Sequence, residues 1–258
     1  MRKRGLKWHL LFLLDILADA YIKLSPRNIY LMAYTAYPLN TFTRSFRELS
    51  KVRAISKEII DGEPVIKIET RGIKLLNEFI SLRKFQKKPW WGYWTVVIFD
   101  IPEENRKVRN KLRRKLKELG FGSWQKSVYI SPHPLVEELT EFLENEGLDA
   151  WTYCFQAKNI GGRENKKLAE EIFPLGKLRK AYKKLKGDIQ RFLKEKWQSR
   201  EIVSREIYFF VKRYFELLQK DPFVPEEIIE EDLGRSEVEE LVNELKNRYF
   251  EIFKDKSR

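Results

Sequence analysis

The sequence predicts an α+β protein built from three consecutive regions, and three patterns support this prediction. Residues 1–88 give the order helix, helix, helix, hairpin, helix. Residues 89–160 alternate β-prone and helical segments in the order β-α-β-β-α-β. Residues 161–258 carry apolar residues at helical spacing and no strand pattern. Antiparallel strands and helices arranged in separate regions are typical of α+β folds, whereas parallel α/β folds repeat a strict βα alternation.

The charge of the chain favours a polyanionic partner. Lys and Arg number 51 against 38 Asp and Glu, which gives a net charge of +13. The excess is uneven, because residues 1–89 hold 18 basic and 8 acidic side chains and residues 175–220 hold 14 and 5. A positive excess of this size attracts nucleic acid first and an anionic membrane surface second.

Cysteine and histidine usage excludes several classes of protein. Cys154 is the single cysteine, so a disulfide framework and a cysteine-based zinc site are excluded. His9 and His133 lie far apart in the sequence, which disfavours a histidine-rich metal cluster, and His133 is expected in a loop, with no partner that the sequence identifies. The apolar N-terminal segment is interrupted by Asp15 and Asp19 and is too short and too polar to span a membrane. We therefore expect a cytoplasmic protein with no membrane partner.

The first region, residues 1–88, is predicted to fold as a winged helix-turn-helix. Residues 8–20 are apolar almost all round and predict a buried helix. The Ser-Pro pair at 25–26 predicts the start of a second helix, and residues 41–51 predict a third. Two β-prone segments then flank the Asp-Gly pair at 61–62, which is a hairpin turn signal. In this fold the third helix enters the major groove of DNA and the hairpin touches the backbone.

The third helix presents a polar face opposite its apolar stripe. Phe42, Phe46 and Leu49 recur at helical spacing and point inward, and the cations lie on the other side at about 100° per residue. Arginine suits such a face because its fork of donors fits guanine or phosphate. A basic face that is merely solvated is the alternative interpretation, and the sequence does not separate base contacts from phosphate contacts. The candidate DNA-binding residues are Asn40, Thr43, Arg44, Arg47 and Lys51 on this helix, and Lys57 and Lys67 on the hairpin.

The second region, residues 89–160, is predicted to be a ferredoxin-like domain that pairs two copies of the chain. A strand at 94–100 precedes a helix at 103–119, and residues 122–132 predict one bent strand or two short strands. A helix at 134–146 and a strand from residue 150 complete the order β-α-β-β-α-β of the ferredoxin-like sandwich. The third region, residues 161–258, is predicted to be a helical domain; its expected helices are 177–198, 200–219 and 237–253.

Asp100, at the end of the first central strand, has two interpretations. Its carboxylate can accept hydrogen bonds from backbone N–H groups at the start of the following helix. It can instead bind Mg²⁺ in a nuclease centre, although Glu103 and Glu104 are the nearest acids and lie in the first helical turn. The structural interpretation is favoured, so we expect no catalytic residue, no metal site and no cofactor, with Asp100 and magnesium as the alternatives.

Several motifs of the central region resemble two related families. They are Val97-Ile98-Phe99-Asp100-Ile101-Pro102, Arg106 and Arg109, Gly120-Phe121-Gly122, and Gln125-Lys126-Ser127-Val128-Tyr129. One family is the small CRISPR spacer-acquisition protein, a ferredoxin-like dimer whose strand-end aspartate is implicated in metal-dependent nuclease activity. The other is the PaaX-like transcriptional repressor family, which places a winged helix before a similar central domain and a helical region after it.

The flanking segments favour the PaaX-like family. The segments 221-DPFVPEEIIEEDLG-234 and 168-LAEEIFPLGKLRKAYKKL-185 resemble its C-terminal region, although Phe173 and Leu233 stand where the family commonly has Trp. The resemblance implies a homodimeric repressor that binds double-stranded operator DNA and responds to a small-molecule effector such as an acyl-CoA. Gln125, Lys126 and Ser127 are then expected at the dimer interface, with a ligand site as the alternative. The rival that it implies is a magnesium-dependent endonuclease or CRISPR spacer-acquisition protein acting through a pair of Asp100 residues across the dimer.

Overall fold

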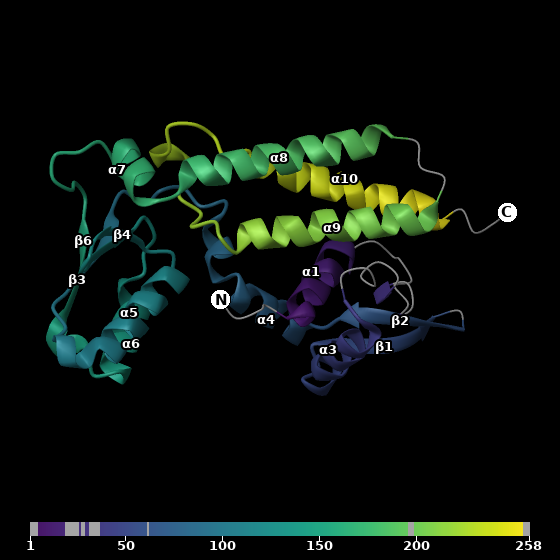
Figure 1. The fold of residues 1–258 in the computed structure, drawn as a ribbon, viewed down its shortest axis with the longest axis horizontal. Coiled ribbons are helices and arrows are strands. Elements are labelled where there is room, and N and C mark those ends of the chain that lie inside the picture. Colours follow the sequence, from purple (N-terminus) through teal and green to yellow (C-terminus); the bar gives the residue numbers. More distant parts are fainter. Residues whose placement is uncertain are drawn as a thin grey trace. The chain divides into compact units, whose positions relative to one another are not determined.

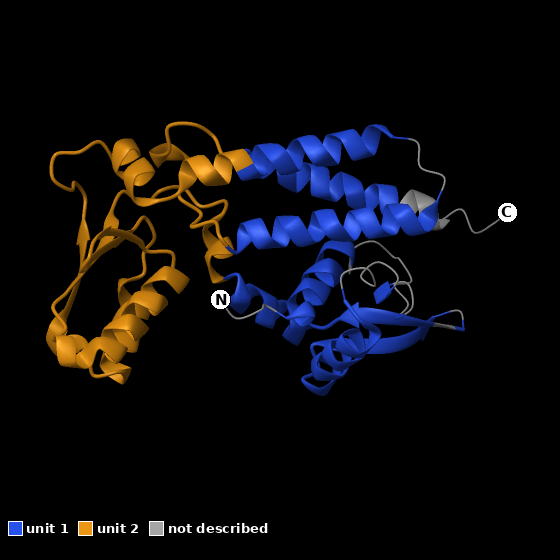
Figure 2. Ribbon diagram, viewed as in Figure 1, with its two compact units in different colours: residues 1–80, 181–219, 234–258 blue, residues 81–180, 220–233 orange. Residues whose placement is uncertain are grey.

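The protein is an α+β structure with helices and two small antiparallel sheets (Figure 1). The computed structural model describes residues 5–18, 26, 29–30, 37–60, 62–195 and 199–254. These residues form two compact units (Figure 2). Unit 1 comprises residues 1–80, 181–219 and 234–258, and unit 2 comprises residues 81–180 and 220–233. The chain therefore leaves unit 1 once after residue 80 and again after residue 219. The division into domains 1–88, 89–160 and 161–258 stays a prediction.

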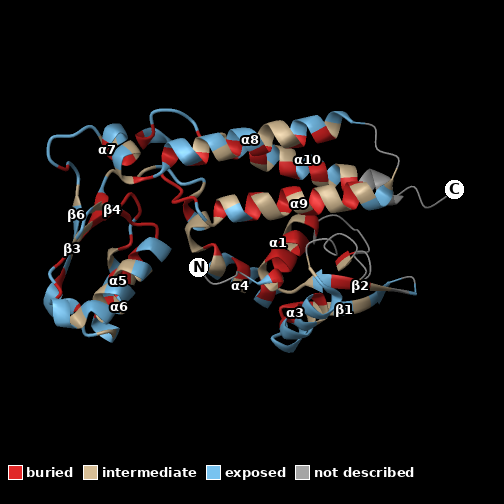
Figure 3. Ribbon diagram, viewed as in Figure 1, coloured by how far each residue is buried: buried red, intermediate tan, exposed pale blue. Residues whose placement is uncertain are grey.

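Unit 1 joins the two ends of the chain around one aromatic core. Its elements are α1 (Leu6–Ala18), α3 (Leu39–Lys51), β1 (Ile55–Ile60), β2 (Glu63–Ile68), α4 (Thr70–Phe79), most of α8 (Leu175–Lys194), α9 (Arg200–Leu218) and α10 (Arg235–Lys254). Helix α1 is buried along most of its length, as its apolar sequence predicts (Figure 3). Phe215 of α9 packs against Phe12 of α1 and Phe79 of α4, with ring centroids 4.9 and 5.9 Å apart. Residues from α1, α4 and α9 therefore share one core.

The predicted hairpin of unit 1 is present. Strands β1 and β2 pair antiparallel, with Ile55 opposite Ile68 and Ile60 opposite Glu63. Asp61, the first residue of the predicted turn, lies outside the described residues, and Gly62 has a φ of 77°. Most of the predicted second helix also lies outside them, and of its span only residues 26, 29 and 30 are described, all helical.

Unit 2 has the strand order of a ferredoxin-like fold. Its elements are η1 (Ser81–Phe85), β3 (Trp94–Phe99), η2 (Glu103–Asn105), α5 (Arg106–Glu118), β4 (Gly122–Gln125), β5 (Val128–Ser131), α6 (Val136–Asn145), η3 (Asp149–Trp151), β6 (Thr152–Ala157), α7 (Asn165–Ile172) and η4 (Glu226–Ile228). The sheet is antiparallel throughout, in the order β4-β5-β3-β6. This is the β-α-β-β-α-β topology that the sequence predicts.

The helices of unit 2 depart from the prediction at two places. Residues 103–105 form a 3₁₀ turn, so α5 begins at Arg106, three residues later than expected. Helix α7 begins at Asn165, whereas the sequence predicts the first helix of this region only from residue 177. Leu168 and Ala169 are its buried residues, and they explain why the helix forms despite its polar start. In the part of the chain that is described, no helix is both long and apolar enough to cross a bilayer.

The segment 220–233 contacts the ferredoxin-like domain within unit 2. Asp221 Oδ1 accepts a hydrogen bond of 2.7 Å from the backbone N–H of Phe223. The Nε2 atom of His133 lies 2.7 Å from the carbonyl oxygen of Pro222 and donates to it, since a carbonyl only accepts. The His133 ring also stacks on Phe85, with centroids 4.1 Å apart. His133 therefore lies in a loop, as predicted, but it is buried and has partners that the sequence did not identify.

Candidate nucleic-acid interface

Helix α3 has one buried side and one solvent-facing side, as its periodicity predicts. Phe42, Ser45 and Leu49 are buried, while Arg44 and Arg47 are exposed. The helix follows Pro38, whose extended backbone precedes the first turn, and it ends with the backbone N–H of Val52 donating to the carbonyl oxygen of Glu48. The apolar stripe packs inward, so the opposite face with its cations meets solvent.

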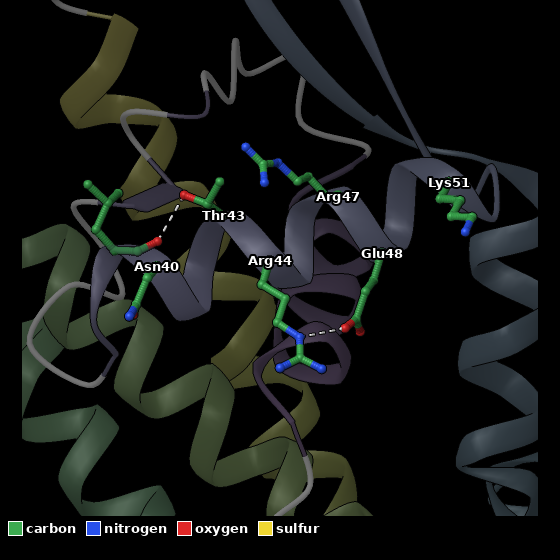
Figure 4. Close-up of a pocket in the computed structure, with 7 residues that line it drawn as sticks. Asn40, Thr43, Arg44, Arg47, Glu48 and Lys51 are labelled. Atoms are coloured by element: carbon green, nitrogen blue, oxygen red, sulfur yellow. Dashed lines mark hydrogen bonds and ion pairs between the residues drawn. The ribbon is translucent and has the colours of Figure 1, made fainter.

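The predicted residues of α3 line one open hollow. Its volume is about 650 Å³, and every described residue of its lining comes from α3 (Figure 4). The lining residues are Leu39, Asn40, Thr43, Arg44, Arg47, Glu48 and Lys51. The structure therefore brings all five predicted residues of this helix together, and adds Leu39 and Glu48, which sequence reasoning missed.

The polar side chains at the start of α3 form hydrogen bonds with nearby backbone groups. Asn40 Oδ1 accepts a hydrogen bond of 2.7 Å from the backbone N–H of Thr41. The Thr43 hydroxyl donates to the carbonyl oxygen of Leu39 at 2.9 Å. Leu39 itself is 58% exposed, so the helix begins with an apolar side chain in solvent. Polar and apolar contacts to base edges in the major groove use these residue types.

Arg44 and Arg47 differ in their contacts. Arg44 Nε donates to Glu48 Oε1 at 3.0 Å, and the two side chains form an ion pair at i and i+4. Arg47 and Lys51 are exposed, and neither forms an ion pair with another residue in the described ranges. Figure 4 shows Arg44 turned toward Glu48, while Arg47 points away from both. The spacing of Arg44 and Glu48 was the signal in the sequence that could have identified Glu48.

The two predicted lysines of the hairpin lie on opposite faces of the ribbon. Lys57 of β1 is opposite Ile66 of β2, whereas Lys67 is opposite Ser56, and side chains alternate between faces along a strand. Lys67 Nζ lies 3.2 Å from both carboxylate oxygens of Glu58, so its charge is largely compensated. Lys57 is exposed and has no ion pair in the described part of the chain. Lys57 is therefore the better placed of the two to meet a phosphate.

Asp100 is exposed at the end of β3, and its backbone N–H donates to the carbonyl oxygen of Trp151 at 2.9 Å. Among the described residues, no hydrogen bond to the Asp100 carboxylate is present and neither η2 nor α5 has a side-chain cap, so the capping interpretation is not borne out. The anion at the start of the helix is Glu103, whose carboxylate lies 2.7 Å from Arg109; the hydrogen bond from Arg109 lowers the pKa of Glu103. Across the residues with described positions, no three Asp, Glu, His or Cys side chains gather as metal ligands do.

Unit 2 exposes a strip of large apolar side chains on its sheet. Tyr153 and Phe155 of the edge strand β6 are 70% and 43% exposed, and Ile98 of β3 is 39% exposed. Ile98 is opposite Tyr153, and Phe155 follows two residues later, so all three point to the same face. Helix α5 covers the other face, where Arg113 lies over the Phe99 ring. Gln125 and Lys126, the predicted interface residues on β4 and its turn, are exposed, and Ser127 is half-buried.

The comparisons with known proteins agree with this architecture. Residues 87–169 match the family model described as the PaaX protein central Cas2-like domain. Among solved structures, the uncharacterized protein Rv0674 from Mycobacterium tuberculosis is similar, with a TM-score of 0.62 and 13% identity over 93% of this chain and 94% of that chain. That likeness extends the shared fold to nearly the whole length of both chains. No curated protein matches the chain. The resemblance to the PaaX-like family that the sequence motifs indicate is therefore confirmed, and the match that confirms it lies in the central domain.

Proposed function

We propose that the protein is a DNA-binding transcriptional regulator whose N-terminal region acts as a winged helix-turn-helix. The observation that carries this proposal is the exposed face of α3, with Asn40, Arg44, Arg47 and Lys51 on one side of a helix that is followed directly by the β1–β2 hairpin. A helix of this kind fits the major groove, and a hairpin beside it reaches the adjacent backbone. The net charge of +13 supplies the sequence-independent attraction to phosphates.

The contribution of α3 is tested with the full chain and a duplex selected from a random pool. Arg44→Ala and Arg47→Ala should each weaken binding about tenfold or more, because each removes a cation from the groove-facing side. A variant that loses a phosphate contact should also reduce the slope of log affinity against log salt by about one, whereas a variant that loses a base contact should leave the slope nearly unchanged. The measurement is a titration followed by fluorescence anisotropy at several salt concentrations.

Arg114→Ala is the matched control for this experiment, because it removes an exposed arginine from α5 in unit 2. It should change the affinity much less than either α3 variant. If Arg44→Ala and Arg47→Ala both bind the selected duplex as tightly as the unmodified chain, α3 is not the recognition helix.

We further propose that the regulator is a homodimer whose subunits meet through the apolar strip of Ile98, Tyr153 and Phe155. Contiguous exposed apolar surface marks protein contacts, and a two-fold axis lets the same strip meet itself. Two copies then present two α3 helices to the half-sites of a palindromic operator, one helical turn or a multiple of it apart. Repression by occupying that operator, and relief by a small-molecule effector such as an acyl-CoA, follow from the PaaX-like resemblance. The rival endonuclease activity at Asp100 has no comparable supporting observation.

The dimer proposal predicts that Tyr153→Ser combined with Phe155→Ser raises the dimer dissociation constant at least tenfold. Tyr153 and Phe155 are 70% and 43% exposed in the single chain, so their replacement should cost little folding stability. Sedimentation velocity over a range of concentrations measures the dissociation constant. Tyr93→Ser is the control, since Tyr93 is 41% exposed but lies outside the strip. An unchanged dimer in the double variant places the subunit contact elsewhere.

A further inference from the structure

The two arginines of α3 differ in their contacts, and this difference indicates different roles. The side chain of Arg44 is 83% exposed, yet its Nε donates to Glu48 Oε1 at 3.0 Å. Arg47 is exposed on the same helix and has no ion pair within the described residues. An exposed pair at i and i+4 adds little to stability, so the contact is better explained by what it does to the arginine.

A carboxylate bound to Nε fixes the plane of the guanidinium group. Within the described residues, Nε is the atom of Arg44 that is bound. Its two terminal amino groups lie side by side, which is the arrangement that binds O6 and N7 of one guanine. Holding them in place before binding removes part of the ordering cost of the complex. Arg47 has no ion pair among the described residues, and a cation that is not held in one orientation suits a phosphate, where the direction of approach matters less.

The negative charge of Glu48 also supports a role for this residue in orienting Arg44. A carboxylate on a surface that meets phosphates opposes binding of any DNA, because the two anions repel. Glu48 nevertheless lines the same hollow as Asn40, Arg47 and Lys51, and its side chain is 45% exposed. An anion in this place lowers general affinity, so its benefit must lie in selecting one sequence over others.

We propose that Glu48 is a positioning residue that aims Arg44 at a guanine in the operator, while Arg47 and Lys51 contact phosphates. This proposal rests on the proposed DNA-binding function and adds to it the kind of base that is read. The operator half-site accordingly contains a guanine in the major groove opposite the middle of α3. The sequence alone does not separate base contacts from phosphate contacts; the Arg44–Glu48 contact is the observation on which we assign them.

The test compares affinities of the full chain for a selected operator, for copies in which single G·C pairs become A·T, and for an unrelated duplex. One of the G·C replacements should cost the unmodified protein about tenfold or more, and Arg44→Ala should abolish the penalty at that one position. Glu48→Ala should reduce the penalty there to less than about threefold. The Glu48→Ala variant should also bind the unrelated duplex about two- to threefold more tightly, because the substitution removes a negative charge that repels phosphates.

Two further variants separate the hydrogen bond from the charge. Glu48→Gln removes the same charge but keeps an acceptor for Arg44 Nε, so its guanine penalty should lie between those of the unmodified protein and Glu48→Ala. Glu58→Gln removes an anion from the hairpin, where Glu58 pairs with Lys67. It should strengthen binding of the unrelated duplex and leave the guanine penalty unchanged.

The outcomes distinguish this proposal from the one on which it rests. A guanine penalty that is the same in Glu48→Ala and in the unmodified protein overturns the positioning role while leaving the protein a DNA-binding regulator. Loss of the penalty in Arg47→Ala, with the penalty intact in Arg44→Ala, overturns the assignment of the two arginines. A full chain that binds no duplex in a salt-dependent manner removes the DNA-binding function and this inference with it.

Discussion

Replacing Gly72 by alanine is expected to destabilise the protein by about 3 kcal/mol, near the upper end of the usual cost of overpacking a well-packed site. A Cβ atom at Gly72 of α4 would lie 2.2 Å from the carbonyl oxygen of Ala54 and 2.9 Å from Cγ1 of Ile68. The first of these is a backbone atom, and it already accepts a hydrogen bond of 3.0 Å from the N–H of Glu69. The Ala54 carbonyl cannot move away without opening the contact between α4 and the chain that enters β1.

The same substitution at Gly187 should have the opposite sign. Gly187 lies in α8, and a Cβ atom there would meet no other atom within 4 Å. Alanine in a helix interior is favoured over glycine by about 1 kcal/mol, because glycine loses more backbone freedom on folding. Thermal unfolding followed by far-UV circular dichroism should therefore show a midpoint lowered by roughly 6–12 °C for Gly72→Ala and raised by roughly 2–4 °C for Gly187→Ala. A midpoint that does not fall in Gly72→Ala contradicts the close packing of α4 on this segment.

Local periodicity sufficed to predict the elements whose burial is decided by their own residues. Helix α1 is apolar on nearly every side and is buried, and Phe42 and Leu49 mark the inward face of α3. The order of strands and helices in unit 2 is also a local property, because each segment has either a strand or a helix period. For the same reason, the side of α3 that carries Arg44 and Arg47 could be predicted without coordinates.

Contacts between residues distant in the sequence could not be predicted in this way. Phe215 packs against Phe12, about two hundred positions earlier, and no local pattern records such a pairing. The same holds for His133 and Pro222, whose hydrogen bond joins the ferredoxin-like domain to a segment beyond α9. Within the candidate interface, the spacing of Arg44 and Glu48 is visible in the sequence. The rotamers that bring Glu48 to Nε of Arg44 are not, and the proposed division of roles depends on them.

Stability should fall between pH 6.5 and pH 4 because of His9, which is buried in the core of unit 1. Burial, with a smaller contribution from the charge of Lys212, lowers the pKa of His9 to about 4. At neutral pH the ring is therefore uncharged. The Tyr37 hydroxyl lies 3.1 Å from Nδ1, and Nε2 lies 4.0 Å from a carboxylate oxygen of Glu216. The contact between His9 and Glu216 is an ion pair only below the pKa of His9, where the ring is charged.

The direction of the pH effect follows from the two pKa values of His9. In the unfolded chain His9 takes up a proton near pH 6.5, whereas in the folded protein it does so only near pH 4. Protons therefore favour the unfolded chain across this interval. The contribution of neutral His9 to the free energy of unfolding is fully present above pH 6.5. About 3 kcal/mol of this contribution is lost as the pH falls to 4. The free energy of unfolding of His9→Gln should be lower at neutral pH but should fall less over the same interval.

Lys212→Met is the control that separates the effect of the Lys212 charge on the pKa of His9 from the effect of burial. Lys212 lies over the Tyr37 ring, at 5.5 Å from its centroid, and its charge opposes protonation of His9. Its removal should raise the pKa of His9 and so narrow the pH interval over which stability is lost. The chain has only two histidines, so a proton NMR titration with His9→Gln as the assignment standard follows the ring directly. A His9 that titrates near pH 6.5 in the folded protein would mean that its ring is solvated, and the core that joins α1 to α9 would have to be open at that point.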